Sequence, residues 1–554
     1  MVRDLPRTLS FEAMTKKFLI LLAGLPFGEV SSAVFGPICQ WHRDPCTSMA
    51  IHWVQNNGES PEVWRVAAGP YHFGENPALF LRRPIQLPVG LTGESLIVVE
   101  WPGGYSFNAY MNGEEIGQVP DDGQSVEFRI GQKFAGSRVL LGLSIRKADR
   151  PAGDPKHGPT VFVRDGNRRM VLCDGNSSWN YLPGSSKDVR WNEVPPLAEL
   201  VEPEQGFAFA YRLCEAAEWG SADITSRPFG ETRYRAFSVD LDNLAPRSRY
   251  VFKLLWKGHL LGTWFFETAP REFEDGISFV TGGDMFHTRE MLDAMNRRAG
   301  TESPLFALLG GDLAYANGVD GDRWLEWIES WNQCAIAPDG RLIPMIPVIG
   351  NHEVKGAAYR PTNAPPRIQA PHFYSLFHGM TDGSKFAVDF GSYMTVIALD
   401  SGHTENVATQ TQWLRETLES RAGFSRKFVC YHRPAWGTGA KPDAVEIQRS
   451  WCPLFEQHRV NAVFENDHHV YKRTHPLTAG RRDDAGGVVY MGDGAWGTRT
   501  RGVARNVTKT RPFLAQAEAT NHLIKVTFRD NHVLYEAMTA DGKLIDSSRR
   551  SVGK

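Results

Sequence analysis

The chain has 554 residues, of which 42% are hydrophobic, and this is enough for more than one domain with a large core. Its formal net charge of −2 argues against a nucleic-acid-binding protein, because binding a phosphate backbone requires a basic face. Its 7 cysteines are too few and too scattered for a disulfide-dense scaffold, and they include no Cys-x-x-Cys pair, so a zinc ribbon is not supported. Cys39 and Cys46 are close enough to form a bridge in an oxidising compartment.

The first 33 residues have the form of a secretory signal. Lys16-Lys17 precede an apolar run from Phe18 to Leu25, and Ser31-Ser32-Ala33 supply the small residues of a cleavage site. This run is too short to be a permanent membrane span, and no other apolar stretch is long enough. We expect residues 1–33 to be a signal peptide and the protein to be secreted or periplasmic. The alternative is a buried N-terminal helix.

Two separated parts of the chain predict one β-sandwich. Cys46–Val54 alternates between apolar and polar residues like a half-buried strand. Further candidate strands are separated by turn residues and lie at Phe207–Tyr211, Tyr234–Val239, Tyr250–Trp256 and Trp264–Thr268. Leu244-Ala245-Pro246 followed by Tyr250 resembles a strand corner of fibronectin type III domains. We expect residues 34–77 and 191–270 to form this discontinuous, fibronectin type III-like domain.

Residues 78–190 predict a separate β-module inserted into that sandwich. Strand-like segments lie at Ser95–Glu100, Tyr105–Tyr110 and Val139–Ile145, and Asn112-Gly113 is a strong hairpin turn signal. The pattern resembles a jelly-roll module of the galactose-binding type. Such a module either binds carbohydrate or only packs against its neighbour, and the sequence leaves both open.

After residue 270 the chain alternates between strands and helices. We expect helices at Thr288–Arg298, Asp322–Trp331, Thr411–Arg421 and Ile447–Phe455. Core strands are expected at Tyr393–Leu399, Lys427–Tyr431 and Ala462–Phe464. Residues 271–554 are therefore predicted to form one further domain.

Three apolar segments in this domain each end in glycine, followed by a residue that can bind a metal. Ile277–Gly283 leads to Asp284, Leu305–Gly311 leads to Asp312 and Tyr315, and Ile343–Gly350 leads to Asn351, His352 and Glu353. The third segment is the weakest strand candidate, because Pro344 and Pro347 cannot donate to a β-ladder. Glycine before the ligand lets the backbone turn sharply and leaves room for an ion.

Two later segments repeat this pattern. His432 follows Phe428–Tyr431, and Asp467-His468-His469 follow Val463-Phe464. In open α/β folds, ligands gather just beyond the carboxyl ends of strands, so these side chains are expected to meet. A carboxylate can bridge two cations, and two cations roughly 3.5–4 Å apart can clamp both oxygens of an in-line phosphoryl displacement. The ordered set predicts a dinuclear hydrolytic site.

These five pieces in this order resemble the calcineurin-like metallophosphoesterases. Tyr315, three residues after Asp312, is similar to the purple acid phosphatase branch, and Asp44–Met49 resembles the start of that branch's N-terminal domain. The resemblance covers most of residues 38–66 and 200–545. It implies an α+β fold, a four-layer sandwich of two mixed β-sheets flanked by helices, preceded by β-sandwich domains.

The resemblance also implies a role for each matching residue. The first metal would be held by Asp284, Asp312, Tyr315 and His469, and the second by Asn351, His432 and the bridging Asp312. Tyr315 would be a tyrosinate ligand to ferric iron, so the implied pair is Fe with Mn, Zn or a second Fe. His352 would face the substrate as a phosphate contact or general acid. The implied catalytic set is therefore His352, Asp312 and Asn351.

One departure from the family pattern concerns the last motif. The family has Gly-His-x-His where this chain has Asn466-Asp467-His468-His469, so either Asp467 or a shifted His468 takes the first ligand position. An Asp467 carboxylate would favour harder ions such as Mn, Fe or Mg over Zn. Its negative charge would make bound water less acidic and raise the pH optimum. A pH–rate profile of Asp467→His that did not move down would refute this.

A second departure is the lack of histidine in Arg433–Gly439, where plant and animal members often carry substrate-binding histidines. Arg433 is a candidate phosphate ligand because its guanidinium fork matches phosphate oxygens, although an arginine beside a strand end more often forms a surface ion pair. His287 could contact the water of the first metal or be an ordinary loop residue, and His403 is a further candidate. Gly492–Gly497 is expected to be a structural turn.

The function predicted from these observations is a secreted dinuclear phosphatase that hydrolyses phosphate monoesters by attack of a metal-bound hydroxide on phosphorus. The substrate would be a phosphorylated small molecule or a sugar phosphate. One alternative is a phosphodiesterase on the same site. Another is a carbohydrate-binding surface protein whose metallophosphoesterase domain is inactive, and metal content would distinguish it.

Overall fold

The computed structural model describes residues 34–56, the strands and adjoining residues between 65 and 184, residues 206–256, and residues 259–552 apart from 378, 380–382 and 493. The expected signal peptide lies outside these residues. Within them, no helix is long and apolar enough to cross a membrane.

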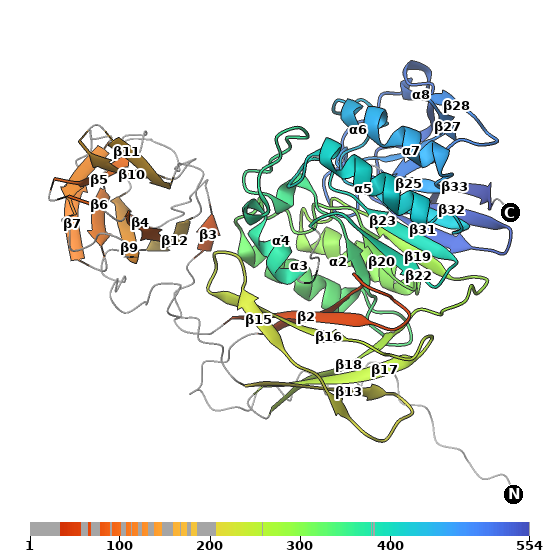
Figure 1. Ribbon diagram of the computed structural model, residues 1–554, viewed down its shortest axis with the longest axis horizontal. Coiled ribbons are helices and arrows are strands. Elements are labelled where there is room, and N and C mark those ends of the chain that lie inside the picture. The colour runs from red at the N-terminus through yellow and green to blue at the C-terminus, as the bar shows by residue number, and fades with distance from the viewer. Residues whose placement is uncertain are drawn as a thin grey trace, which may run out of the picture.

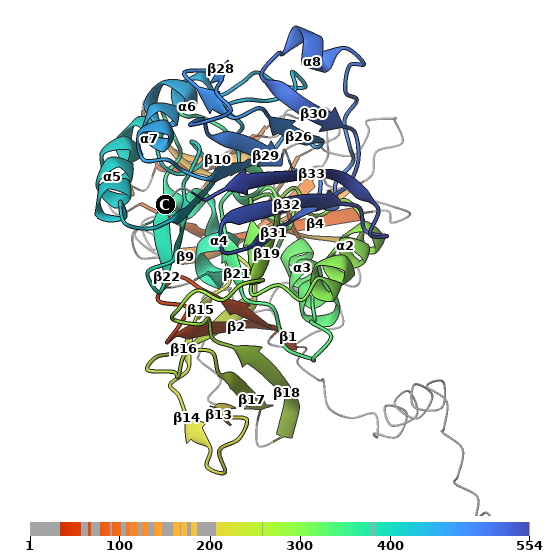
Figure 2. The ribbon, with the colours of Figure 1, turned by 90° about the vertical axis from the view of Figure 1, so that its right-hand side faces the viewer.

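Two mixed β-sheets form the centre of the molecule (Figures 1 and 2). The larger sheet has the strand order β15 (Thr225–Pro228), β16 (Tyr234–Leu241), β2 (Met49–Asn56), β1 (Val34–Gln40), β21 (Met345–Pro347), β20 (Ala307–Leu309), β19 (Ser278–Gly282), β31 (Leu523–Phe528), β32 (His532–Met538) and β33 (Leu544–Ser551). The second sheet has the order β22 (Phe386–Phe390), β23 (Met394–Ala398), β24 (Arg426–Cys430), β25 (Ala462–Glu465), β29 (Val489–Gly492), β26 (Tyr471–Thr474) and β30 (Leu514–Glu518).

Aromatic side chains fill the space between the two sheets. The ring of Phe279 stacks on Phe306 at 4.8 Å and meets the edge of Phe428, from the opposite sheet, at 5.4 Å. These residues are fully buried and belong to one continuous apolar core. The two sheets therefore pack face to face, as the sequence predicts.

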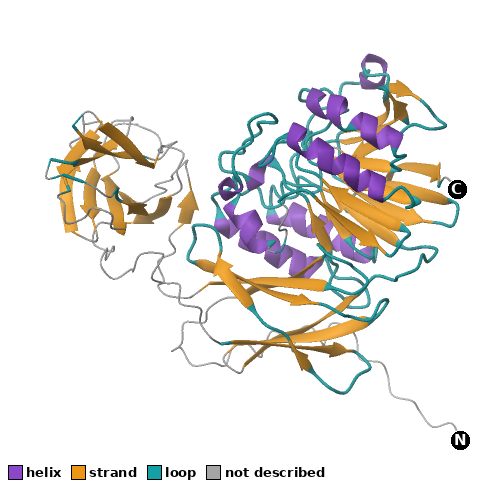
Figure 3. Ribbon diagram, in the orientation of Figure 1, coloured by secondary structure: helices purple, strands orange, loops and turns teal. Residues whose placement is uncertain are grey.

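Helices cover the outer face of each sheet (Figure 3). The larger sheet packs on α2 (Arg289–Thr301), α3 (Gly321–Cys334) and α4 (Pro371–Leu376), and the second on α5 (Val407–Ser420), α6 (Val445–Ser450) and α7 (Cys452–Gln457). The other helical turns among the described residues are η2 (Asn351–Glu353), η3 (Arg367–Gln369) and α8 (Val507–Thr510). The four-layer α+β fold is confirmed.

One expected helix is wrong in detail. Residues Ile447–Phe455 do not form a single helix, because α6 ends at Ser450 and α7 begins at Cys452. Pro453 lies in the first turn of α7, and proline lacks the N–H that a continuous helix would need there. The helix is therefore interrupted at Trp451.

The sandwich next to this core shares a sheet with it. Strands β14 (Gly220–Ser221), β13 (Phe207–Leu213), β17 (Arg249–Trp256) and β18 (His259–Glu267) form a four-stranded sheet. It packs on the β16–β2 part of the larger sheet, where Trp53 stacks on Phe237 and meets the edge of Phe207. Tyr250 Oη accepts a hydrogen bond from Ala245 N at 2.7 Å, which closes the expected strand corner. The fibronectin-type assignment and the boundary at residue 270 stay predictions.

The inserted segment forms two sheets with a core of their own, and one of them also includes β3 (Arg65–Ala67), whose residues the sequence assigns to the sandwich. One has the order β3 (Arg65–Ala67), β12 (Trp179–Gly184), β4 (Ala78–Gln86), β9 (Arg138–Arg146), β6 (Phe107–Met111) and β7 (Glu114–Val119), and the other β11 (Arg168–Cys173), β10 (Thr160–Asp165), β5 (Leu96–Glu100) and β8 (Ser125–Arg129). Met111 pairs with Glu114, as a two-residue hairpin requires. The turn residues themselves, Asn112-Gly113, lie outside the described residues.

All seven cysteines are free thiols. Cys39 and Cys46, whose spacing allows a bridge, are both buried, and Cys46 Sγ donates a hydrogen bond to the carbonyl of Pro270 at 3.3 Å. The two thiols thus serve as small apolar core residues.

A buried histidine lies where α4 meets the larger sheet. His372 is 1% exposed, and neither ring nitrogen has a hydrogen-bond partner within the described part of the chain. Its ring lies against Gly230, where an added Cβ would come within 2.7 Å of Nε2. Burial, aided by the positive charge of Lys355, lowers the pKa of His372 to about 3.

This histidine should make the fold sensitive to acid. An unfolded histidine takes up its proton near pH 6.5, and the folded protein does so only near pH 3, so stability falls as the pH drops below about 6.5. The loss amounts to about 1.4 kcal/mol per pH unit across that window. We expect His372→Met to flatten the dependence of Tm on pH between 4 and 6.5. Parallel profiles for the variant and the wild type would contradict this.

Candidate metal centre

The predicted ligands meet because five strands end at the same side of the core. In the larger sheet, Gly282, Leu309 and Pro347 lie in register on parallel strands, and Asp284, Asp312 and Asn351 follow them. In the facing sheet, Cys430 and Phe464 pair on β24 and β25, and His432 and Asp467 follow. The two sheets thus supply opposite walls of one site.

Several ligand candidates have a left-handed backbone. The φ angles are positive at Asp284 (55°), Asp312 (53°), Tyr315 (54°), Asp467 (75°) and His469 (60°). Such residues cost of order 1 kcal/mol or more each and cluster at functional sites. Two glycines make room for them, because a Cβ would lie 2.3 Å from Asp312 Oδ1 at Gly350 and 1.7 Å from Asp284 Oδ2 at Gly494. The turn at Gly492–Gly497 therefore packs directly on a predicted ligand.

One side of the centre is formed by Asp284, Tyr315 and His469. The phenol of Tyr315 donates to Asp284 Oδ1 at 2.8 Å and lies 3.0 Å from His469 Nε2, which is itself 3.0 Å from Asp284 Oδ1. His469 Nδ1 donates to the Arg499 carbonyl at 3.0 Å, so Nε2 presents its lone pair to the centre. Burial and the nearby carboxylates raise the pKa of Tyr315.

The other side is organised around His432. Its Nε2 lies 3.1 Å from Asn351 Oδ1, 3.3 Å from Asp312 Oδ2 and 3.7 Å from Asp467 Oδ1. Its Nδ1 donates to the Gly310 carbonyl at 2.9 Å, which turns Nε2 toward the centre. Burial lowers the pKa of His432, but the surrounding carboxylates outweigh it and raise that pKa to about 10.

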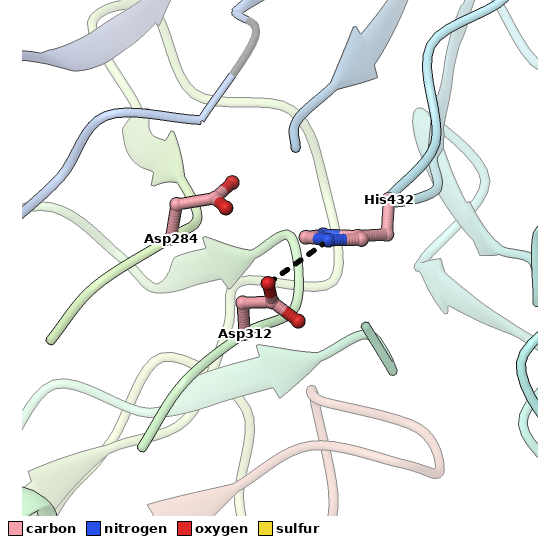
Figure 4. Close-up of side chains that lie close together, drawn as sticks. All are labelled: Asp284, Asp312 and His432. Atoms are coloured by element: carbon pink, nitrogen blue, oxygen red, sulfur yellow. Dashed lines mark ion pairs between the residues drawn. The ribbon is translucent and has the colours of Figure 1, made fainter. Parts of the chain in front are cut away.

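The donor set fits metal ions. Asp284, Asp312 and His432 are buried, and each offers a ligand atom within 4.8 Å of the others (Figure 4). Buried carboxylates are normally paired or coordinate metals. Carboxylate, amide and phenol oxygens with two imidazole nitrogens suit hard or borderline ions. Asp284, Tyr315 and His469 would hold one ion, Asn351, His432 and Asp467 a second, and Asp312 lies between them.

Glu353 has a role that the sequence did not assign. Its buried carboxylate accepts hydrogen bonds from three backbone N–H groups, those of Gly350 at 2.7 Å and of Asp312 and Leu313 at 2.8 Å. Burial, then the charge of Asp312, raises the pKa of Glu353 to about 8. It therefore joins the two loops that carry Asp312 and Asn351.

Asp467, not His468, points toward the centre. His468 is buried against Gly437, where an added Cβ would lie 2.2 Å from its Cε1. Asp467 forms ion pairs with two cations, Arg433 and Lys441. Burial raises the pKa of Asp467, but His432, Lys441 and Arg433 outweigh it and hold that pKa at about 2. Arg433 and Lys441 offset the negative charge that Asp467 brings to the centre. That charge was the reason to expect a higher pH optimum, so the structure gives less reason to expect one.

The remaining candidates lie around this centre. His352 stacks on Tyr315 at 4.3 Å, its backbone N–H donates to Asp312 Oδ1 at 2.7 Å, and its side chain is 26% exposed. His287 Nε2 accepts a hydrogen bond from Arg499 Nε at 2.6 Å, and the carbonyl of the same Arg499 binds the candidate ligand His469. His403 is buried and packs edge-on against the His432 ring at 5.4 Å.

Comparisons with known proteins point to a family. Residues 281–471 match the family model of calcineurin-like phosphoesterases. The uncharacterized proteins MT2654 and Rv2577 of Mycobacterium tuberculosis are each 30% identical to this chain over 370 residues. That alignment covers 58% of this chain and 65% of each relative, so the chain spans slightly less than two thirds of their length.

A solved structure shares the fold. The purple acid phosphatase PPD1 from yellow lupin (Lupinus luteus) seeds aligns with a TM-score of 0.50 over 94% of this chain and 96% of its own, at 13% identity. At this identity the likeness shows the fold alone. All seven predicted metal ligands, from Asp284 to His469, lie within the family match. The chain therefore contains a calcineurin-like phosphoesterase domain, built on the fold of a purple acid phosphatase.

Proposed function

We propose that this protein is a dinuclear metallophosphatase that hydrolyses phosphate monoesters. The main observation behind the proposal is that Asp284, Asp312 and His432 are buried and lie close together at the ends of strands from two sheets. Tyr315 with His469 on one side, and Asn351 with Asp467 on the other, supply donors for two ions. When bound, such ions would polarise the phosphoryl group and lower the pKa of a water molecule.

The chain's own residues would orient the substrate and move a proton. His352 is the partly exposed titratable group over the centre, and its Nδ1 is hydrogen-bonded to Asn317 Oδ1. Because Nδ1 donates to this oxygen, Nε2 carries the lone pair of the neutral ring and faces the substrate, and it donates a proton to the leaving alkoxide from the protonated form of the ring. Arg433, one residue beyond His432, carries a guanidinium group that matches phosphate oxygens.

The same proposal includes the metals and the location of the protein. The phenol of Tyr315, between Asp284 and His469, supports iron on its side, paired with Mn, Zn or a second Fe. The basic and apolar run at residues 16–25 supports export. N-terminal sequencing of the protein recovered outside the cytoplasm should begin near residue 34, and an intact N-terminus there would contradict cleavage.

Metal analysis with turnover tests the activity. We expect two metal ions per chain and faster turnover of p-nitrophenyl phosphate than of bis-p-nitrophenyl phosphate. Faster hydrolysis of the diester would make the protein a phosphodiesterase. A protein that holds no metal and hydrolyses neither ester after reconstitution with Fe, Mn or Zn would refute an enzymatic function.

A further inference from the structure

A cation pair stands beside the second-metal side of the centre. Arg433 Nη1 binds Asp467 Oδ2, and Lys441 Nζ binds Asp467 Oδ1. We propose that Arg433 and Lys441 together form a clamp for the phosphoryl oxygens, and that Lys441 sets a preference for dianionic monoesters over monoanionic diesters. This inference rests on the proposed function, because it concerns the substrate of that same site.

The charges of this group do not balance. Arg433 and Lys441 contribute two positive charges, and Asp467 contributes one negative charge. Asp443, two residues after Lys441, is bound by Arg511 at 2.7 Å and accepts from Gly437 N at 3.1 Å. Among Arg433, Lys441 and Asp467 themselves, one positive charge is left over, which a phosphoryl group would offset.

The positions of the three side chains place the cations toward solvent. Asp467 is 1% exposed, whereas Arg433 is 13% and Lys441 is 25% exposed. Asp467 Oδ1 lies 3.7 Å from His432 Nε2, so the carboxylate that binds the two cations is itself one of the candidate ligands of the second ion. An anion entering from solvent would meet the cations at the edge of the centre.

The clamp is also held in place before any ligand binds. The Arg433 guanidinium lies over the Tyr359 ring at 4.5 Å, and its backbone N–H donates to Ser401 Oγ at 2.9 Å. Asp467, which both cations bind, is held in turn by a hydrogen bond from its backbone N–H to Asp284 Oδ2 at 2.8 Å. An arginine fork and a lysine ammonium each have several donors, so one contact with Asp467 leaves others available for phosphate.

The competing explanation is that the two cations only neutralise Asp467. In that case, removing Lys441 would disturb the metal site and leave intrinsic phosphate affinity unchanged. Phosphate binding and metal content, measured on the same sample, separate the two explanations.

The test compares the metal-loaded wild type with Lys441→Met, Lys441→Arg and the control Lys509→Met, which removes an exposed lysine of α8. Inorganic phosphate is titrated by calorimetry, and metal content is measured in parallel. We expect Lys441→Met to bind phosphate at least about 10-fold more weakly, the usual scale for a charged hydrogen bond, with unchanged metal content. Lys441→Arg should recover part of the affinity, and Lys509→Met should match the wild type.

Steady-state kinetics complete the test. Lys441→Met should raise KM for p-nitrophenyl phosphate more than for bis-p-nitrophenyl phosphate. Equal phosphate affinity in Lys441→Met and the wild type, or a loss of metal that accounts for the weaker binding, would overturn the clamp. A metal-loaded wild type that binds phosphate but hydrolyses neither ester would refute the proposed function, while the binding comparison would still decide the clamp.

Discussion

Replacing Asp312 by asparagine is expected to abolish hydrolysis, with kcat/KM falling on the order of 10³-fold or more. The Asp312 carboxylate is 1% exposed and lies between the two sides of the centre, 3.3 Å from His432 Nε2. An amide has the same shape and can still accept from the His352 N–H, but it lacks the charge that bridging two cations requires. Asparagine also tolerates the left-handed backbone found here, so the fold should survive.

This variant is tested by kinetics together with metal analysis. Metal content should fall along with activity, while the circular dichroism spectrum stays that of the wild type. Asp484→Asn makes the same chemical change at an exposed carboxylate and should leave both quantities unchanged. If Asp312→Asn kept its activity, Asp312 would not be a bridging ligand.

The second large effect is expected at a buried ion pair behind the centre. Lys472 and Glu465 are both 0% exposed and pair with each other, and Lys472 also donates to the Trp436 carbonyl at 2.6 Å. Glu465 Oε1 accepts from Tyr431 Oη at 2.6 Å and from Ala435 N at 2.7 Å. The pair thus ties together the strand ends that carry His432 and Asp467.

Lys472→Met should lower the free energy of unfolding by about 3–5 kcal/mol, because it leaves the Glu465 charge buried without its cation. Urea unfolding measures this change. The double variant Lys472→Met/Glu465→Gln should recover part of it, since both charges are then gone. Arg482→Met, which breaks an exposed pair with Asp484, should have little effect. A shift for Lys472→Met no larger than for Arg482→Met would contradict a structural role for the pair.

The strand ends, and the polar residues that meet there, could be predicted because each carries a local signal. An apolar run, a glycine and a ligand residue occur together in sequence, and parallel strands bring those ends to one edge. The left-handed backbone at Asp284 and Asp312 is consistent with this sequence pattern, because aspartate adopts that conformation more readily than most residues.

Contacts between distant residues could not be predicted in this way. Nothing near Lys441 indicates that its ammonium binds Asp467, and Lys472 looks like an ordinary strand residue until Glu465 is seen beside it. The break at Trp451, by contrast, could have been predicted from Pro453. The apolar residues around it keep a helical spacing, and this favoured a single helix instead. The choice between Asp467 and His468 needed the backbone, which buries His468 against Gly437.

The pairing of β1 with β21 covers an edge that the strands after residue 271 would otherwise leave open. Gln40 pairs with Met345, and Trp41 N donates to the Met345 carbonyl at 2.9 Å. The Trp41 ring is buried between Phe306 and Phe390, with ring centroids 6.0 and 5.6 Å away. A fragment beginning at residue 271 would expose this aromatic pocket beside an open strand edge, which is the kind of surface on which proteins aggregate. The N-terminal strand β1 therefore extends the larger sheet and covers both this edge and the aromatic pocket beside it.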